Sequence, residues 1–235
     1  AHPRVIPVPE AFTLGKPWLM EGNRVIAKDD FKGSPADLNG RTTSLGGKTW
    51  TRAIGQGCFQ LTGSGAAKVL GTVEKPCPGR TAYTIDWANP TCADVAVRIT
   101  PPGVQRGKRE KGRGGLIFWQ DDRNYITLTV FMDDWYGTSI AAFFHVDGFE
   151  ELYDAVWTNV GRRIHWGVPY DFRVVFDGKQ FLAFVNGEPV LYRALSDIYP
   201  DWDQLLIKQV GIVANWEWGN DTGSVFENFE AKDNA

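Results

Sequence analysis

The stretch YDFRVVFDGKQFLAFVNGEPVLYR, residues 170–193, decides the fold class. It contains three short runs rich in β-branched and aromatic residues, which favour extended strands. Asp177-Gly178 separates the first two runs and Asn186-Gly187 the last two. Both dipeptides supply the positive φ angles that tight hairpins need. The sequence therefore predicts a three-stranded antiparallel meander over residues 170–193.

The chain around this stretch follows the same strand pattern. In YITLTVF, residues 125–131, the odd positions should face one side of a sheet and the even positions the other. Long helical periodicity is absent, and SDIYPDWDQLL at 196–206 is the one plausible helical turn, with Ser196 or Asp201 as a cap and Pro200 in its first turn. The pattern predicts an all-β sandwich or barrel.

Length and charge narrow the class of protein. The 235 residues fit one β-sandwich domain over 1–235, of which 1–24 form an N-terminal extension. A net charge of −3 disfavours nucleic acid as a partner. No apolar run is long enough to cross a membrane, and the N-terminus lacks the apolar run of a signal peptide. We expect the mature form of a secreted or periplasmic protein, acting as a monomer.

The cysteines and one basic segment leave alternatives open. Of Cys58, Cys77 and Cys92, the best pair is Cys77 with Cys92, whose loop of about 15 residues would add ~3 kcal/mol of stability. Cys58 is then a buried thiol, although all three could be reduced in a cytosolic protein. The run QRGKREKGRGG at 105–115 predicts a solvated loop, or alternatively a lip that attracts an acidic polysaccharide.

Four segments carry a family resemblance. They are DDFKGSPADLNGRTTSLGGKTWTRAIGQGCFQLTG at 29–63, GGLIFWQDDRNYITLTV at 114–130, GVPYDFRVVFDGKQFLAFVNGEPV at 167–190 and QVGIVANWEWGNDTGSVFENFEA at 209–231. In this order the chain resembles the concanavalin A-like, laminin-G-like lectin and glucanase superfamily, over about residues 25–232. The most specific matches are Gly115, Phe118, Asp122, Asn124 and Tyr125, and the block from Gly211 to Phe229.

The resemblance implies a two-sheet antiparallel jelly-roll sandwich with one sheet bent into a concave groove. Such domains include lectins, carbohydrate-binding modules, glycosidases and polysaccharide lyases, so the fold does not settle function. It also implies a structural calcium ion near the joined terminal strands. Asp29-Asp30, Asp121-Asp122 and Asp133-Asp134 provide the oxygen ligands that calcium prefers, and we expect Asp29 and Glu227 to bind the ion. The Glu-x-Asp-x-x-Glu strand of laminarinase-like members and the Gln-Ile-His strand of alginate-lyase-like members are absent.

The segment FHVDGFEELYDAVWTNVGRRIHWG, residues 144–167, is where we expect chemistry, because polar and aromatic residues concentrate there. A lyase acting on a uronate needs a cation, a base and an acid. The candidates for these roles are Arg162 or Arg163, His145 or His165, and Tyr153 or Tyr170. A glycoside hydrolase needs two carboxylates, for which the candidates are Glu150, Glu151, Asp154 and Glu217.

The abundance of rings, with 10 Trp, 7 Tyr and 14 Phe, favours plain sugar binding. The candidate ligand-binding residues are Trp119, Tyr125, Trp135, Trp157, Arg163, His165, Trp166 and Trp216. Glu217 should face away from Trp216 and Trp218, because adjacent strand residues alternate. The leading hypothesis is an extracellular polysaccharide-recognition domain that binds glycan on its concave sheet. The alternatives are a lyase or hydrolase on the same scaffold, or a protein-interaction module of laminin-G type.

Overall fold

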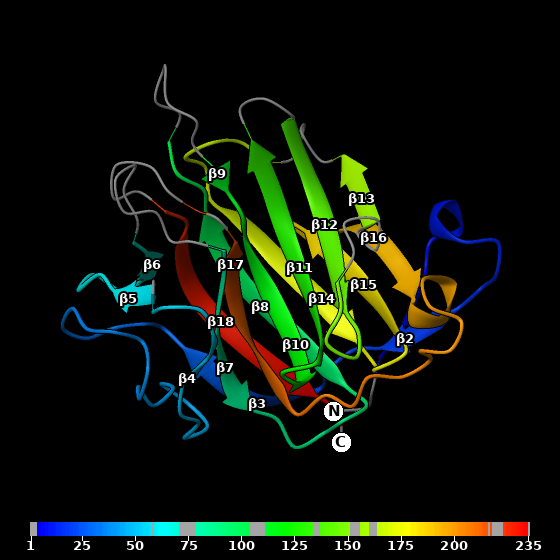
Figure 1. Ribbon diagram of the computed structural model, residues 1–235, viewed down its shortest axis with the longest axis horizontal. Coiled ribbons are helices and arrows are strands. Elements are labelled where there is room, and N and C mark those ends of the chain that lie inside the picture. Colours follow the sequence, from blue (N-terminus) through cyan, green and yellow to red (C-terminus); the bar gives the residue numbers. More distant parts are fainter. Residues whose placement is uncertain are drawn as a thin grey trace.

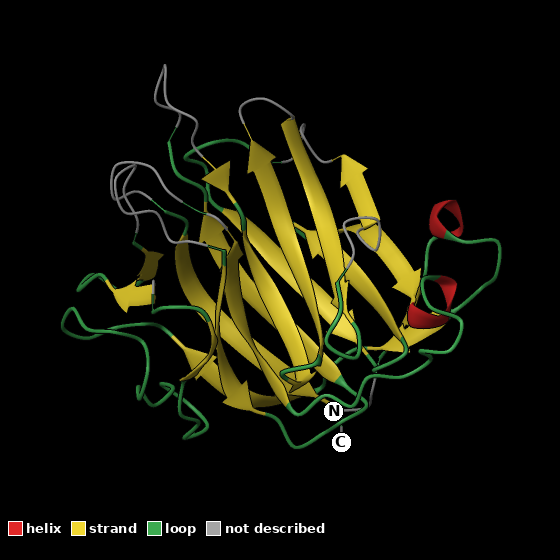
Figure 2. Cartoon of the chain, in the orientation of Figure 1, coloured by secondary structure: helices red, strands yellow, loops and turns green. Residues whose placement is uncertain are grey.

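The computed structural model describes residues 4–57, 59–70, 79–103, 111–133, 137–150, 156–159, 164–215, 217 and 223–234, with the backbone only at 111, 133, 137 and 156–159. Most of this chain forms two antiparallel sheets that lie face to face (Figures 1 and 2). This is the predicted jelly-roll sandwich. None of the described helices is long or apolar enough to span a membrane.

The sheet nearer the viewer in Figure 1 is called the front sheet. Its strands are β4 (Thr51–Ile54), β7 (Arg80–Asp86), β9 (Lys111–Gly112), β10 (Gly114–Asp121), β11 (Asn124–Asp133), β12 (Gly137–His145), β13 (Val156–Asn159) and β17 (Gln209–Asn215). They are ordered β13-β12-β11-β10-β17-β7-β4, and β9 pairs with β11. The pairing of β10 with β17 brings together segments almost 100 residues apart in the chain, as the crossed connections of a jelly roll require.

The rear sheet contains the predicted meander. Its strands are β3 (Arg24–Asp29), β5 (Phe59–Leu61), β6 (Ala67–Val69), β8 (Ala93–Thr100), β14 (Tyr170–Phe176), β15 (Gln180–Val185), β16 (Glu188–Ala194) and β18 (Val225–Asp233). The order is β16-β15-β14-β8-β18-β6-β5, with β3 paired to β18. Asn186 and Gly187 have φ angles of 50° and 80°, which confirms the turn predicted between β15 and β16.

The core lies between the two sheets and is rich in phenylalanine. Ile126, Leu128, Val130 and Met132 of β11 enter it, which fits the predicted alternation of side chains along this strand. Phe118 of β10 meets Phe176 of β14 edge to face across the sandwich, with 5.2 Å between ring centroids. This interlock fixes the sheets relative to one another and leaves the outer face of the front sheet available for other chemistry.

The N-terminal extension covers part of the rear sheet. Strands β1 (Val5–Pro7) and β2 (Trp18–Met20) pair with each other, and a 3-10 turn at Glu10–Phe12 joins them. Val8 and Leu19 pack against Val175, Leu182, Phe184 and Tyr192 of the meander. The extension thus lies on the side of the sandwich opposite to the outer face of the front sheet.

Two local predictions need correction. The segment 196–206 contributes only to a 3-10 turn at Leu195–Asp197, which begins too early for Ser196 or Asp201 to cap it and ends before Pro200. In the basic run, residues from 111 onward belong to β9, to Arg113 and to β10, whereas residues 105–110 lie outside the described part.

The predicted Cys77–Cys92 disulfide is also wrong, because Cys92 carries a free, buried thiol. Cys92 directly precedes β8, and β7, whose seven residues span roughly 20 Å, lies between Cys77 and Cys92 in the chain. The prediction recognised a strand between the two cysteines but took no account of the length that this strand spans. Burial raises the pKa of the Cys92 thiol to about 11. Cys58 and Cys77 lie outside the described residues.

Candidate functional site

Three rings form a row across the outer face of the front sheet. Trp119 of β10 is directly opposite Tyr125 of β11, and Tyr125 is directly opposite His145 of β12. The indole and phenol rings are stacked, with 5.2 Å between their centroids and 15° between their planes. The phenol and imidazole rings are stacked with 4.5 Å between centroids and 9° between planes. We call Trp119, Tyr125 and His145 the ring row. Cross-strand register therefore brings together three residues that the sequence named as separate candidates.

An ion pair stands beside the ring row. Arg80, at the start of β7, donates from Nη1 to Oε2 of Glu150 at 2.7 Å and from Nη2 to Oε1 at 2.8 Å. Its Nη1 also donates to the Tyr125 hydroxyl at 3.2 Å. Only 13% of the Arg80 side chain and 21% of the Glu150 side chain are exposed. This is a bidentate, largely buried pair, the geometry that gives an arginine and a carboxylate their strongest contact.

The surroundings shift the proton affinities of two of these groups. Burial lowers the pKa of Arg80, but hydrogen bonding to Glu150 and its negative charge outweigh burial and raise that pKa above its ordinary value. Burial also raises the pKa of Tyr125, against the opposing effect of Arg80. The His145 Nδ1 atom lies 3.6 Å from Glu150 Oε2, just beyond hydrogen-bond reach. At neutral pH the site therefore presents a charged guanidinium and a phenol that keeps its proton.

The floor of the site contains polar atoms that are not satisfied. Within the described chain, Oγ1 of Thr127, Oγ1 of Thr129, Nε of Arg80 and Nδ1 of His145 are buried without a hydrogen-bond partner. Thr127 and Thr129 follow Tyr125 on the same face of β11, and both are fully buried. Buried polar groups of proteins are nearly always paired, so unpaired ones indicate that a water molecule or a ligand group completes them.

Two glycines leave the middle of this face without side chains. Gly115 of β10 and Gly211 of β17 lie in the same rows as Thr129 and Thr84 of the neighbouring strands. A Cβ at Gly115 would lie 1.9 Å from the Leu128 carbonyl oxygen, and a Cβ at Gly211 would lie 1.9 Å from the Tyr83 carbonyl oxygen. No side chain fits at either position, which gives a physical reason for two of the residues that carry the family resemblance.

Several predicted site residues lie outside the described part of the chain. These are Glu151, Tyr153, Asp154, Arg162, Arg163, Trp135 and Trp216. Trp157 is described only as backbone, in β13 opposite Ala141. The roles given to these residues stay predictions.

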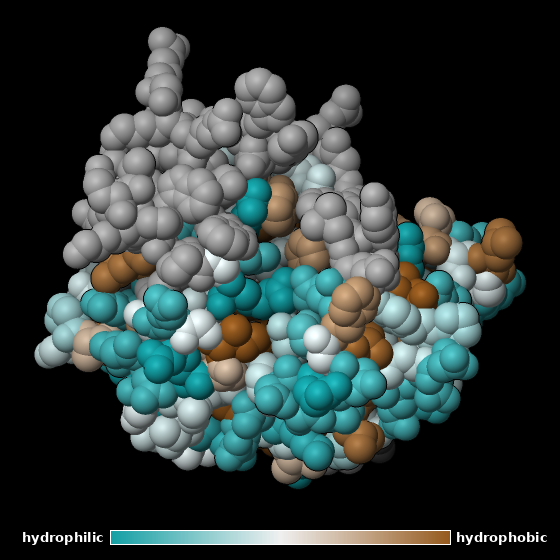
Figure 3. Space-filling model, viewed as in Figure 1, coloured by the Kyte–Doolittle hydropathy of each residue, from teal (hydrophilic) through white to brown (hydrophobic). Residues whose placement is uncertain are grey.

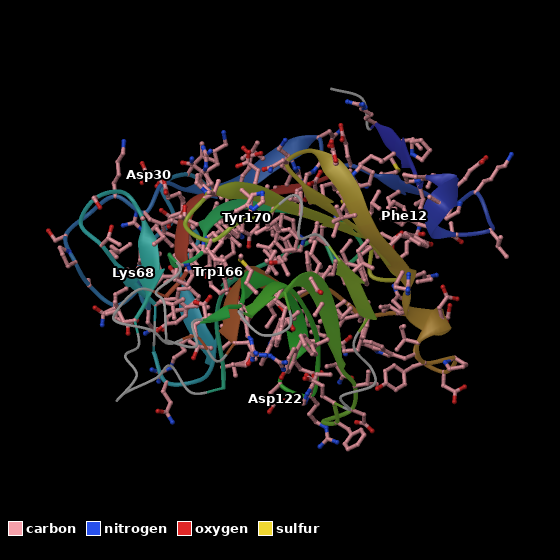
Figure 4. All side chains as sticks on the ribbon, turned by 90° about the horizontal axis from the view of Figure 1, so that it is seen from above. Phe12, Asp30, Lys68, Asp122, Trp166 and Tyr170 are labelled. Atoms are coloured by element: carbon pink, nitrogen blue, oxygen red, sulfur yellow. The ribbon has the colours of Figure 1, made fainter. Side chains whose placement is uncertain are left out.

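Other predicted residues lie away from the ring row. Trp166 is half-buried against the core between the two layers (Figure 4). His165, which precedes it in the chain, is exposed. Tyr170 is buried in the core, and burial raises its pKa well above the ordinary value. Glu217 is fully buried and accepts hydrogen bonds from the backbone of Arg113 and Ser224 at 2.6 and 2.9 Å, so it is not a solvated charge.

The residues expected to bind calcium make other contacts. Both Asp29 oxygens accept hydrogen bonds from the Arg41 guanidinium, and Trp50 Nε1 donates to Oδ2 at 2.7 Å. Ser44 and the backbone of Phe31 donate to Oδ1. Asp29 is therefore an ion-pair residue among protein donors. Glu227 of β18 is half-exposed, and calcium at Asp29 and Glu227 stays a prediction that these contacts do not support.

Sequence reasoning missed Arg80 altogether. It stands in the run GRTAY without a motif or a charged neighbour that would mark it. It reaches Glu150, 70 positions away, because β7 and β12 belong to the same sheet. Such a contact depends on the order of strands, which no local pattern in this chain reveals.

No protein-family profile matches the chain, and no curated protein matches it in sequence. Solved structures do match. The carbohydrate recognition domain of Emp47p is 13% identical with a TM-score of 0.56, covering 89% of this chain and 98% of that one. A glycosyl hydrolase family protein from Mycobacterium fortuitum is 12% identical with a TM-score of 0.57, covering 89% and 100%. The carbohydrate binding module CBM66 from Bacillus subtilis is 15% identical with a TM-score of 0.52, covering 84% and 98%.

These likenesses show the fold. The chain is a jelly-roll β-sandwich, the fold that the sequence resemblance implied. Proteins with quite different names share this architecture. The function of this chain must therefore be argued from its own site.

Proposed function

We propose that this chain is a glycan-recognition domain that binds saccharide on the outer face of the front sheet, over the ring row. The observation that carries the proposal is the set of buried, unpaired polar atoms of Arg80, Thr127, Thr129 and His145 on that face. Sugar hydroxyls both donate and accept hydrogen bonds, so they are chemically matched to unpaired groups of these kinds. Structures of the same fold that are named as carbohydrate-binding support this assignment. We further propose that this face is the concave one and that the protein acts outside the cytoplasm.

The surface of this face favours a polar ligand over a protein partner. In Figure 3, which is viewed from the front-sheet side, polar and apolar residues are interspersed over the described part and form no broad apolar patch. Protein-binding surfaces of soluble domains more often present a contiguous apolar patch. The mixture supports glycan binding over the laminin-G type of protein interaction.

The test compares the two described histidines. Wild-type protein, His145→Ala and His165→Ala are titrated with a panel of neutral and acidic polysaccharides by calorimetry. We expect the wild type to bind at least one glycan and His145→Ala to weaken that binding about tenfold. His165→Ala should keep the wild-type affinity, because His165 is exposed away from the ring row. Absence of binding to the whole panel overturns the function, and equal losses in both variants overturn the location.

A polysaccharide lyase is the second candidate. The site brings a phenol, an imidazole and a guanidinium together at Tyr125, His145 and Arg80, which are the group types that β-elimination of a uronate uses. Incubation with acidic polysaccharides, followed by ultraviolet absorbance and reducing-end assays, separates the possibilities. New absorbance of an unsaturated uronate would identify a lyase, and reducing ends without it would identify a hydrolase.

A further inference from the structure

We infer that this site selects uncharged glycans and that Glu150 sets the selectivity by neutralising Arg80. The inference rests on the proposed function and adds the class of ligand to it. It follows from how the charges of the front-sheet face are paired and from how firmly Glu150 is held.

Both terminal nitrogens of Arg80 are occupied by the Glu150 carboxylate, at 2.7 and 2.8 Å. A uronate or sulfate that used Arg80 as its receptor would have to displace this carboxylate or approach it closely. Displacement leaves a buried carboxylate without its partner, and close approach places two negative charges side by side. Either route weakens the binding of an anionic sugar relative to a neutral one.

The position of Glu150 is fixed by the turn that precedes it, because hydrogen bonds within this turn and to Arg123 hold its backbone. Val146 and Phe149 exchange backbone hydrogen bonds of 2.8 and 2.9 Å. Gly148 donates to the Arg123 carbonyl at 2.8 Å, and the Arg123 side chain donates back to the Asp147 carbonyl at 2.8 Å. The carboxylate is therefore positioned against Arg80 before any ligand arrives, which keeps the cost of displacing it high.

The other buried cation of this face, Arg113, packs against an aromatic ring. The Arg113 guanidinium lies 3.6 Å from the centroid of the Phe131 ring, and only 9% of the residue is exposed. The buried Glu217 lies beside its backbone, and Glu217 Oε1 accepts from the Arg113 amide at 2.6 Å. The ion pair that the described chain shows beside the ring row is therefore Arg80–Glu150, and the Thr127 and Thr129 hydroxyls are uncharged groups of the same face.

The experiment measures wild type and Glu150→Gln against matched probes that differ only in charge. The first pair is fully methyl-esterified and de-esterified galacturonan, and the second is laminarin and C6-oxidised laminarin. Any further neutral glycan that the panel identifies is paired with its own C6-oxidised form. Titrations are run at about 0.15 M NaCl, where loose surface attraction is screened.

Two further variants isolate the cause. Arg80→Met combined with Glu150→Gln removes both charges and should restore the wild-type preference. Glu21→Gln is the matched control, because Glu21 is also 21% exposed and pairs with an arginine, Arg173, at 3.0 Å on the rear sheet. It should behave as the wild type. Thermal melts verify that each variant is folded.

We expect the wild type to bind the neutral member of a pair about tenfold more tightly than the charged member. Glu150→Gln should raise affinity for the charged member by about tenfold, since Arg80 then carries an uncancelled charge. A wild type that prefers the charged members, or an unchanged preference in folded Glu150→Gln, overturns the inference while leaving glycan binding intact. Absence of binding to every probe instead overturns the proposed function itself.

Discussion

Replacing Thr127 with valine should stabilise the protein, which is unusual for a buried threonine. The Thr127 hydroxyl is fully buried on the outer face of the front sheet, and within the described chain it has no hydrogen-bond partner. A buried hydroxyl without a partner costs about 1 to 3 kcal/mol, and valine keeps the shape and the strand preference of threonine. We expect Thr127→Val to raise the free energy of unfolding by about 1 kcal/mol, or to raise Tm by about 2 °C for a chain of this length.

Thr84→Val is the matched control and should have the opposite effect. Thr84 lies in the same cross-strand row, with Gly211 and Ile117 between it and Thr127, and is 1% exposed. Its hydroxyl donates to Gln209 Oε1 at 2.5 Å, so valine removes a hydrogen bond and leaves the Gln209 oxygen without this donor. The free energy of unfolding should fall by about 1 to 2 kcal/mol.

Urea denaturation followed by fluorescence measures both variants, and equal m-values verify that the unfolded states are comparable. The same Thr127→Val protein should bind glycan more weakly than the wild type, because it has lost a group proposed to meet a sugar hydroxyl. A loss of 1 kcal/mol or more in Thr127→Val would refute the reasoning, since it would mean that the hydroxyl is already paired in the free protein.

The remaining predictions concern three buried groups elsewhere. Asp29→Asn should lower the free energy of unfolding by about 3 kcal/mol, because it leaves the Arg41 guanidinium without its fully buried partner; a loss under 1 kcal/mol in urea denaturation would contradict this. Burial raises the pKa of Glu217 above its ordinary 4.5, so its contribution to stability is fully present below about pH 4.5 and is lost as pH rises through the folded pKa. The stability advantage of the wild type over Glu217→Gln should shrink from about pH 4 to about pH 8, and a constant difference would argue against the shift. Cys92 should be protected from iodoacetamide in the folded protein and should react once the protein is unfolded, with no reductant needed. Mass spectrometry of a non-reduced digest that finds Cys92 in a disulfide would contradict the free thiol.

Local chemistry explains which parts of the fold were predictable. The meander of β14, β15 and β16 followed from Asp177-Gly178 and Asn186-Gly187, because turn residues and strand preference act over a few positions. Alternation along 125–131 likewise predicted that successive side chains of β11 face opposite sides of the sheet, although not which side is the core. The Cys77–Cys92 disulfide failed for the complementary reason, since pairing depends on where the ends of a strand lie in space.

The site was predictable only in its separate members. Trp119 and Tyr125 were named as ligand-binding residues and His145 as a catalytic one, and their register across three strands was not foreseen. Glu150 was named as a possible acid or nucleophile without its partner Arg80. The contact between Glu150 and Arg80 follows from β7 joining the front sheet beside β17, a long-range pairing that one sequence does not reveal.

The stacking in the ring row changes what the aromatic residues of this site can do. A sugar ring stacks on a flat aromatic face, but Tyr125 has Trp119 against one face and His145 against the other. The row therefore presents ring edges and its two end faces to a ligand. Selectivity must then come mainly from polar groups, namely the Thr127 and Thr129 hydroxyls, the imidazole and the neutralised Arg80–Glu150 pair.

Glu150 is the carboxylate that the described chain places beside the ring row, and both its oxygens are held by Arg80. A retaining or inverting hydrolase needs two carboxylates that act on the glycosidic bond. Binding a neutral sugar is compatible with Glu150 paired to Arg80. Hydrolysis would require a second carboxylate and would require Glu150 to leave Arg80.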